Sequence, residues 1–305
     1  MHIRTNKTLN MALRPILKLC EWLGRHNPTL LMRMRYFSKF HRKLDLNNPQ
    51  TLNEKILYLS LKTDTTLWTR CADKYEVRGY VKECGLEETL TKLYAHWTNE
   101  KNVNFESLPS SFVMKSVQGC GDVLIVKDKT AFDQAAALKS IHTMLHERYG
   151  AIEGGSHYLR IDPGVIVEEL LPVEDGNYLI DYKIWCFNGK PSYILTCSNR
   201  LKGTVMLGSY DTEWNYHPEH LISSKEHPTR PEPLPKPENF EEMIRIAEKL
   251  SSPFPQVRVD LYNIKGKVYF GELTFTAYGG LMNYYTDEFQ KMAGKKININ
   301  YNKQA

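Results

Sequence analysis

Two carboxylates, Asp260 and Glu272, interrupt the apolar pattern of two strand-like segments near the end of the chain. These segments, residues 256–262 and 267–275, are joined through Gly266 and read as a β-hairpin. A magnesium ion bound to phosphate needs a few hard oxygen ligands, and water and phosphate oxygens complete its octahedron. A carboxylate pair that converges from neighbouring strands offers such ligands.

The register of this hairpin decides whether the two carboxylates meet. A three-residue loop at 264–266, with its glycine at positive φ, would place Arg258 opposite Glu272 and Asp260 opposite Phe270. The carboxylates would then be diagonal neighbours on one face, roughly 7–8 Å apart at the backbone. Burying such a pair is costly unless a cation compensates it. Two simpler interpretations stay open: an edge strand that turns one carboxylate to solvent, or an ion pair with Arg258.

A short turn earlier in the chain has the composition of a phosphate-binding loop. Residues 112–117 and 122–126 are strand-like, and the turn between them contains Gly119 and Gly121. Lys115 lies just before this turn, and an ammonium beside exposed backbone N–H groups can hold nucleotide phosphates. The segment is neither a P-loop nor a dinucleotide-binding fingerprint, and a plain hairpin explains the same glycines.

Three further features are typical of nucleoside or anion binding. An apolar run ends in Glu168 and Glu169, which could meet adenine and ribose or simply face solvent. Lys183 interrupts another apolar strand and needs an anionic partner, either a protein carboxylate or a phosphate. Arg200 and Arg258 are candidates for the same role, with salt bridges as the alternative.

The elements that would position these side chains form a front of helices followed by mixed strands and helices. Predicted helices cover 11–24 with Gly24 as the stop, about 52–61 behind a Thr51–Glu54 capping box, 72–84 closing on Gly85, 131–147, and 238–251. Further predicted strands cover 164–169, 179–187 and 191–197, the last two joined by an Asn188-Gly189 turn. Residues 228–237 contain five prolines and read as an extended surface connection. This pattern predicts an α+β or mixed α/β fold with at least two lobes.

Positive charge is concentrated at the beginning of the chain. Residues 1–43 carry ten Lys or Arg and one Glu, whereas the whole chain has a net charge of +5. Trp22, Tyr36 and Phe37 lie in the same segment. Such a leader could dock on anionic lipid or grip a polyanionic substrate, or it could be a solvated helical face packed on the body. Nucleic acid is excluded as a partner, because the remaining chain is not basic and has no nucleic-acid-binding motif.

The sequence predicts a cytoplasmic protein that could associate peripherally with the inner membrane. No run of about eighteen apolar residues occurs, so no segment is expected to span a bilayer. The first residues, which include Arg4, Lys7 and Arg14, lack the uninterrupted apolar stretch of a signal peptide. The six cysteines form no CxxC pair and no zinc-finger spacing, which favours free thiols in a reducing compartment.

Seven segments, in this order, resemble the TupA-like branch of the ATP-grasp superfamily, which is associated with teichuronopeptide and capsular polysaccharide biosynthesis. They cover roughly residues 48–275, and their joint occurrence is far more specific than any one of them. The segments are PQTLNEKILYL, ADKYEVRGYVKE, LPSSFVMKSVQGCGD, VIVEELL, DYKIWCFNGKP, YDTEWN and FEEMIRIAEKLSSPFPQVRVDLYNIKGKVYFGELTF.

The resemblance implies an ATP-grasp-like α+β fold in which two lobes enclose ATP and Mg²⁺. The expected divisions are a basic helical extension at 1–47, an N-terminal or lid region at 48–170, a core lobe with the metal site at 171–290, and a polar tail at 291–305. The implied nucleotide contacts are Lys74, Lys115, Gln118, Gly119, Gly121, Glu168, Glu169, Leu170 and Lys183. The implied metal ligands are Asp260, Glu272 and Thr274, and the implied catalytic residues are Lys183, Arg258 and Arg200.

Two positions depart from the family pattern. Many ATP-grasp enzymes have an Asn where this chain has Thr274, although a hydroxyl can still bind a metal. The turn at 118–121 is poorer in glycine than many loops that cover phosphates.

The resemblance also implies a reaction, in which ATP converts a carboxylate to an acyl phosphate that an amine then attacks. The expected product joins an amine or amino acid to a sugar carboxylate on a carbohydrate or lipid-linked acceptor. Three alternatives remain: a glycosyltransferase that uses a UDP- or GDP-sugar, an ATP-dependent sugar kinase, and a non-catalytic polysaccharide assembly factor.

Overall fold

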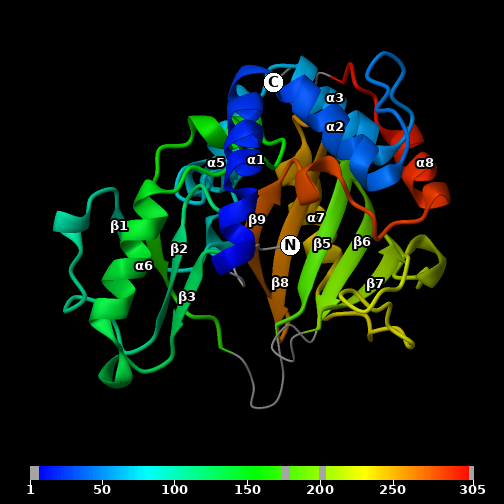
Figure 1. The fold of residues 1–305 in the computed structure, drawn as a ribbon. Helices are drawn as coiled ribbons and strands as arrows, with labels where there is room; N and C mark the ends of the chain where they lie inside the picture. Colours follow the sequence, from blue (N-terminus) through cyan, green and yellow to red (C-terminus); the bar gives the residue numbers. More distant parts are fainter. Residues whose placement is uncertain (1–6, 173–178, 199–203, 302–305) are drawn as a thin grey trace.

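The chain folds around two antiparallel β-sheets that lie side by side, with helices packed on both (Figure 1). The computed structural model describes residues 7–172, 179–198 and 204–301. The predicted α+β class is confirmed, since strands pair with neighbours in antiparallel fashion throughout both sheets.

The first sheet has the strand order β1-β4-β2-β3. Its strands are β1 Leu93–Trp97, β2 Phe112–Ser116, β3 Val123–Val126 and β4 Val165–Glu168. Helix α6, Gln134–His146, covers one face, where alternate residues such as Phe112 and Met114 share a buried cluster with it. Lys115 and Glu168 therefore point from the opposite face.

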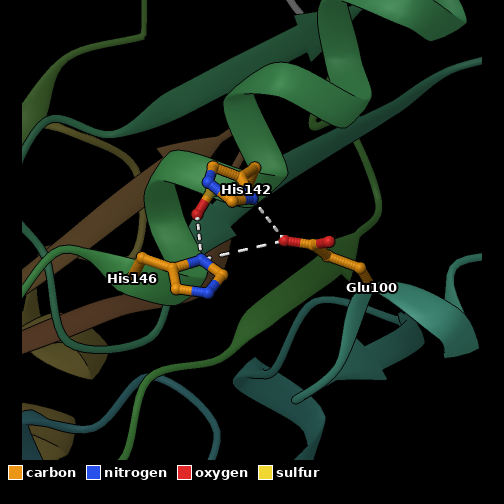
Figure 2. A group of neighbouring side chains, drawn as sticks. All are labelled: Glu100, His142 and His146. Atoms are coloured by element: carbon orange, nitrogen blue, oxygen red, sulfur yellow. Dashed lines mark hydrogen bonds and ion pairs between the residues drawn. The ribbon is translucent and has the colours of Figure 1, made fainter.

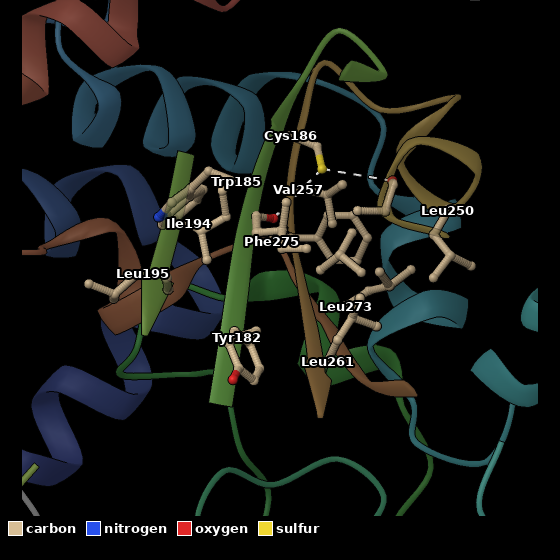
Figure 3. Close-up of a cluster of buried hydrophobic side chains, with 14 of the residues drawn as sticks. Tyr182, Trp185, Cys186, Ile194, Leu195, Leu250, Val257, Leu261, Leu273 and Phe275 are labelled. Carbon is tan, nitrogen blue, oxygen red and sulfur yellow. Dashed lines mark hydrogen bonds between the residues drawn. The ribbon is translucent and has the colours of Figure 1, made fainter. Parts of the chain in front are cut away.

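The second sheet has the strand order β7-β6-β5-β8-β9. Its strands are β5 Asp181–Phe187, β6 Lys190–Ser198, β7 Met206–Asp211, β8 Gln256–Ile264 and β9 Lys267–Thr274. Helix α7, Phe240–Ser251, covers one face, and the Cys186 thiol donates to the Ala247 carbonyl at 3.8 Å (Figure 3). Lys183 and Trp185 occupy the alternate positions of β5, so they point from the other face.

Several of the helices before β1 pack against the core of the second sheet. The helices outside the two layers above are α1 Lys7–His26, α2 Pro28–Phe40, α3 Leu52–Lys62, α4 Thr66–Ala72, α5 Val77–Glu83 and α8 Asp287–Lys296. Leu52, Ile56 and Trp68 share the core of the second sheet, and the Trp68 ring stacks on Phe275 at 4.8 Å. Ile166 of β4 belongs to the same buried cluster, so this core reaches the first sheet as well.

Two helix ends differ from expectation. The first helix runs through Gly24, where a Cβ would lie 1.7 Å from the Ala151 carbonyl oxygen, so this glycine permits close packing and is not a stop. The helix expected at 72–84 begins only at Val77, because α4 ends at Ala72 and the Asp73 carboxylate accepts the N–H groups of Tyr75 and Glu76 in the turn between the two helices.

Other local expectations are confirmed. Thr51 and Glu54 form the capping box, and Asn188 and Gly189, both at positive φ, form the hairpin turn. Part of the tail expected at 291–305 is helical, since α8 extends to Lys296 and buries Phe289.

Within the described ranges, no helix combines the length and apolarity needed to cross a membrane.

A buried histidine gives folding a pH dependence. His157 is fully buried against the rings of Trp68, Tyr158 and Phe275. Within the described part of the chain, neither of its ring nitrogens has a hydrogen-bond partner. Burial, with a smaller contribution from the Arg160 charge, lowers the pKa of His157 to about 3.

Because its folded pKa lies below the unfolded value of about 6.5, the stabilising effect of neutral His157 is complete above pH 6.5 and is lost as the pH falls. We expect this one group to lower the free energy of unfolding by about 2 kcal/mol between pH 7 and pH 5. Urea unfolding at both pH values, compared between wild type and His157→Phe, measures it. An equal pH dependence in both proteins would contradict the expectation.

Candidate functional site

A cavity of about 430 Å³ lies between the two sheets. Its charged lining comes from both of them: Lys115 and Glu168 from the first, and Lys183, Arg258, Asp260 and Glu272 from the second. All of these side chains project from sheet faces opposite α6 and α7. The alternation of each strand therefore separates an apolar core from a charged cavity.

The second sheet supplies a buried network centred on Asp260. Lys183 stands opposite Asp260 in the ladder and donates a hydrogen bond to its carboxylate. Arg258 donates to both Asp260 oxygens at 2.7 Å and to the Thr274 hydroxyl at 3.1 Å. Burial alone would lower the pKa of Lys183, but the charge of Asp260, together with smaller contributions from Asp181 and Cys197, raises that pKa overall. The network therefore holds two cations charged against one carboxylate.

Glu272 completes this group on β9 and is more open than its neighbours. Its side chain is 40% exposed, its Oε1 accepts from the Thr274 hydroxyl at 3.0 Å, and Arg258 lies 3.7 Å away. Burial opposes its charge, but Lys74, Lys183 and Arg258 together lower the pKa of Glu272 to about 2. It is thus a charged acceptor facing the cavity.

The hairpin register differs from the expected one. The loop has two residues, Lys265 and Gly266, both at positive φ, and Asp260 stands directly opposite Glu272. A β-bulge at Gly271 makes this pairing. Without the bulge, Asp260 would pair with Gly271, and Glu272 would point to the opposite face of the sheet. A Cβ at Gly271 would lie 2.9 Å from the Asp260 carbonyl oxygen, which is why glycine occupies the bulge.

The first sheet supplies a second carboxylate with its own cations. Glu168 accepts from Lys115 at 2.9 Å, from Arg78 at 2.9 Å and from the Thr91 hydroxyl at 2.9 Å. Burial opposes its charge, but Lys115, Thr91 and Arg78 together hold the pKa of Glu168 below the usual range. Because three donors converge on Glu168, they fix its position at the cavity wall.

The turn after Lys115 is pinned against the cavity by Lys74. The Lys74 ammonium donates to the Gly119 carbonyl at 2.6 Å, and its backbone N–H donates to Val117. A Cβ at Gly119 would lie 2.2 Å from the Ser116 hydroxyl, and Gly121 has φ of +84°, so both positions require glycine. The turn is therefore built for close packing.

Most residues singled out from the sequence meet in this cavity. Those that line it are Lys74, Lys115, Gly119, Gly121, Glu168, Lys183, Arg258, Asp260, Glu272 and Thr274. Gln118 instead donates to the Met144 and Glu147 carbonyls and ties the turn to the end of α6. Glu169 and Leu170 do not line the cavity, and Arg200 lies outside the described residues.

Sequence reasoning missed several residues of the site. Arg78 and Thr91 hold Glu168, and Tyr149, Tyr158 and Tyr284 form part of the cavity wall. Arg78 lies within a segment that was matched to the family, so its charge could have been noticed. Tyr149 and Tyr284 lie in loops and Tyr158 lies in the short 3₁₀ turn Ser156–Arg160, where no periodicity indicates which way a side chain points.

A second cavity, of about 480 Å³, lies beside α4 and β1 and does not have this character. Arg160 there donates to the Thr65 carbonyl and to the Thr69 hydroxyl, and Asp73 accepts backbone N–H groups. These charged side chains serve local structure, so the cavity between the sheets is the stronger candidate.

The family model for TupA-like ATPgrasp proteins matches residues 54–298. This span contains both sheets and every lining residue named above. The chain belongs to the TupA-like ATP-grasp family. The resemblance drawn from the sequence segments is therefore confirmed, and so is the ATP-grasp fold of this family member.

Several solved structures are similar to this TupA-like chain. A D-alanine–D-alanine ligase from Bacillus anthracis complexed with ATP is 15% identical, with a TM-score of 0.43 and coverage of 74% of this chain and 61% of that one. A phosphoribosylamine–glycine ligase from Thermotoga maritima is 11% identical, with a TM-score of 0.37 and coverage of 68% and 48%. A D-cycloserine synthetase is 14% identical, with a TM-score of 0.38 and coverage of 75% and 70%. The chain spans less than two thirds of the D-alanine–D-alanine ligases that it matches, and no curated protein matches it.

The donor set of the cavity fits a magnesium ion. Asp260 and Glu272 stand opposite each other on neighbouring strands, and the Thr274 hydroxyl bonds to Glu272. Hard oxygen donors in small number are what Mg²⁺ takes when phosphates and water complete its shell. Asp260 is now engaged by Lys183 and Arg258, so binding there requires these contacts to be shared with the ion.

Cys120 provides a way to observe occupation of the cavity. It is exposed at the turn beside Gly119 and lines the cavity, whereas Cys71, Cys186 and Cys197 are buried and Cys20 and Cys84 are half-buried. We expect maleimide to modify Cys120 first, and saturating ATP with Mg²⁺ to slow that modification by at least about tenfold, because a ligand that fills the cavity covers the thiol. Peptide mass spectrometry measures the rate, and Cys120→Ser shows the background from the other thiols. Equal rates with and without nucleotide would contradict the placement of ATP.

Proposed function

We propose that the chain is an ATP-dependent carboxylate–amine ligase of bacterial surface polysaccharide biosynthesis. The observation that carries the proposal is the cavity between the sheets, where Asp260 and Glu272 face a second charged group around Lys115 and Glu168. Family membership supports ATP as the nucleotide. A cavity lined by cations and carboxylates from both sheets can hold a triphosphate and its metal ion, since the cations can contact phosphate oxygens and the carboxylates can bind the metal.

The first sheet would hold the nucleotide. Lys115 lines the cavity with a side chain that is 27% exposed, so its ammonium can reach a phosphate while Glu168 and Thr91 keep the wall in place. Lys74 would hold the turn over the phosphates through its bond to Gly119. These contacts use point charges and backbone groups, which suit phosphate oxygens.

The second sheet would carry the reaction. A carboxylate oxygen of the substrate attacks the γ-phosphorus of ATP, and ADP leaves; an amine nitrogen then attacks the acyl carbon, phosphate leaves, and the amine loses a proton. Magnesium held by Asp260, Glu272 and Thr274 would supply charge neutralisation at the phosphates. Lys183 and Arg258 are already fixed by Asp260, so their charges are oriented before the substrate binds.

Product analysis tests this proposal. ADP and phosphate release would be measured with ATP and Mg²⁺ while uronic acids, uronic-acid oligosaccharides and amino acids are supplied singly and in pairs. The ligase releases both products fastest when a carboxylate and an amine are present together. If ADP is released when no amine is supplied, and no free phosphate is released with it, the result indicates a sugar kinase. Release that depends on neither substrate contradicts the ligase proposal.

The carbohydrate acceptor would be lipid-linked, and the first two helices would bring the enzyme to it. Ile16, Leu19 and Trp22 on α1 and Met34 and Phe37 on α2 are large apolar side chains that are more than half exposed. They lie in the segment 1–43, which carries ten Lys or Arg and one Glu. A basic helical surface with exposed Trp and Phe suits the interface of an anionic membrane.

Vesicle sedimentation tests the membrane proposal. The protein should bind vesicles of phosphatidylcholine with phosphatidylglycerol better than phosphatidylcholine alone, and added salt should weaken binding. Trp22→Ser with Phe37→Ser should abolish binding. Leu138→Ser, on the exposed side of α6, is the matched control and should not change it. Binding that is unaffected by the double variant, or that needs no anionic lipid, would contradict this surface.

A further inference from the structure

Two clusters of histidine and carboxylate lie outside the cavity. The first joins α6 to the 3₁₀ turn Glu100–Asn102, where His142 and His146 meet Glu100 (Figure 2). All three side chains are exposed, and the His146 Nδ1 is taken by the His142 carbonyl at 2.8 Å. This cluster is explained by hydrogen bonds at the surface. The His146 Nδ1 that would have to bind a metal already bonds to the His142 carbonyl of the helix.

The second cluster is on the turn η6, Pro218–His220, and is more enclosed. His217, Glu219 and His220 each offer one ligand atom within 4.8 Å of the others. His217 Nδ1 lies 2.8 Å from Glu219 Oε1, and His220 Nε2 lies 4.0 Å from the same oxygen. His220 is buried at 7% exposure, His217 is half-buried and Glu219 is on the surface.

The other ring nitrogen of each histidine has a partner that fixes the ring. His217 Nε2 lies 3.3 Å from the Asp211 carboxylate, and His220 Nδ1 lies 2.9 Å from the Ser209 hydroxyl. Metal-binding histidines are held in this way, with the second N–H donated to a carboxylate or another acceptor. When those nitrogens carry the protons, a metal can replace the proton between His217 Nδ1 and Glu219 Oε1, and His217 Nδ1 and His220 Nε2 then offer their lone pairs to the ion on the side of Glu219. The α6 cluster has no such arrangement.

We propose that His217, Glu219 and His220 bind a zinc ion or another late first-row divalent metal. Two imidazole nitrogens and one carboxylate are ligands that zinc prefers, and a water molecule completes the tetrahedron. The two rings are stacked at 4.7 Å and 14°, so the half-buried His217 ring must tilt toward the ion. The buried His220 already has a fixed orientation.

The metal would stabilise one wall of the cavity. The His220 carbonyl accepts the Thr286 N–H at 3.0 Å, and Ile222 donates to the Tyr284 carbonyl at 2.8 Å. Tyr284 lines the cavity between the sheets. Fixing η6 would therefore fix the strand-like segment that carries Tyr284, without placing the ion among the reacting groups.

Metal titration of the whole chain tests this site. The protein is stripped with a chelator and titrated with Zn²⁺ by calorimetry without ATP, and Co²⁺ is titrated in parallel while its visible absorption is followed. We expect one equivalent of tight zinc and a Co²⁺ spectrum typical of four-coordination. Glu219→Gln and His217→Gln should each weaken zinc binding by at least about tenfold.

The α6 cluster provides the matched control. His142→Ala with His146→Ala should leave the tight equivalent intact, since those side chains belong to the other group. Circular dichroism without metal shows that each variant is folded. No tight equivalent in the wild type overturns the proposal, as does a tight equivalent that survives Glu219→Gln or is lost in the α6 double variant.

Discussion

Replacing Asp260 by Asn should remove magnesium-dependent ATP binding and lower turnover by at least about 100-fold, the scale for loss of one preorganised electrostatic group. Asp260 is the shared partner of Lys183 and Arg258 and is almost fully buried. The Asn side chain would remove the carboxylate to which both buried cations are hydrogen-bonded. The free energy of unfolding should therefore also fall, by about 3–5 kcal/mol.

Glu272→Gln separates the effect on ATP binding from the effect on stability, both of which we expect for Asp260→Asn. Its side chain is 40% exposed and Arg258 lies 3.7 Å from it, so its loss leaves the buried pairs intact. We expect magnesium-dependent ATP binding to disappear while urea unfolding changes little. Calorimetric ATP titration with and without Mg²⁺ measures the first effect. Tight, magnesium-dependent ATP binding in both variants would show that these carboxylates do not hold the metal.

Replacing Glu168 by Gln should destabilise the first sheet by about 3 kcal/mol, because Lys115 and Arg78 would lose their common counter-charge in a buried setting. The Thr91 hydroxyl can still donate to the new amide oxygen. ATP affinity should fall as well, since Glu168 positions Lys115 at the cavity wall.

The pH dependence of this effect has a fixed sign. The folded pKa of Glu168 is lowered, so its stabilisation is complete above its unfolded pKa of about 4.3 and is lost as the pH falls below that value. The difference between wild type and Glu168→Gln in urea unfolding should therefore shrink in acid. Glu169→Gln, at the next and more exposed position, is the control and should change stability by less than about 0.5 kcal/mol. Equal effects of the two substitutions would contradict the role of Glu168.

Much of the architecture could be predicted because it depends on residues that are close together in the sequence. The capping box at Thr51, the Asn188-Gly189 turn and the strands of the charged hairpin depend on neighbours in sequence. Helix α2 and strands β1 and β7 were missed: each is short or carries its apolar residues without a clear period, and its partners are distant in the chain.

The geometry of the site depended on contacts that the sequence does not encode locally. Asp260 and Glu272 were identified, but their pairing depends on a two-residue turn that puts Lys265 at positive φ and on a bulge at Gly271. A non-glycine residue rarely takes that φ, so a three-residue loop was the simpler prediction. The partnership of Glu168 with Arg78 joins residues 90 positions apart, and only the folded chain brings them together.

Nucleotide preference tests the central claim most directly. Thermal unfolding would be followed with ATP, ADP, UDP-sugars and GDP-sugars, each with and without Mg²⁺. At a hundredfold excess over the dissociation constant, a bound nucleotide adds about 2.7 kcal/mol to the stability of the folded chain. We expect ATP to stabilise the protein, and we expect this effect to require Mg²⁺, Asp260 and Glu272. Stabilisation by a UDP- or GDP-sugar alone, with no effect of ATP, would contradict the ligase and favour a glycosyltransferase.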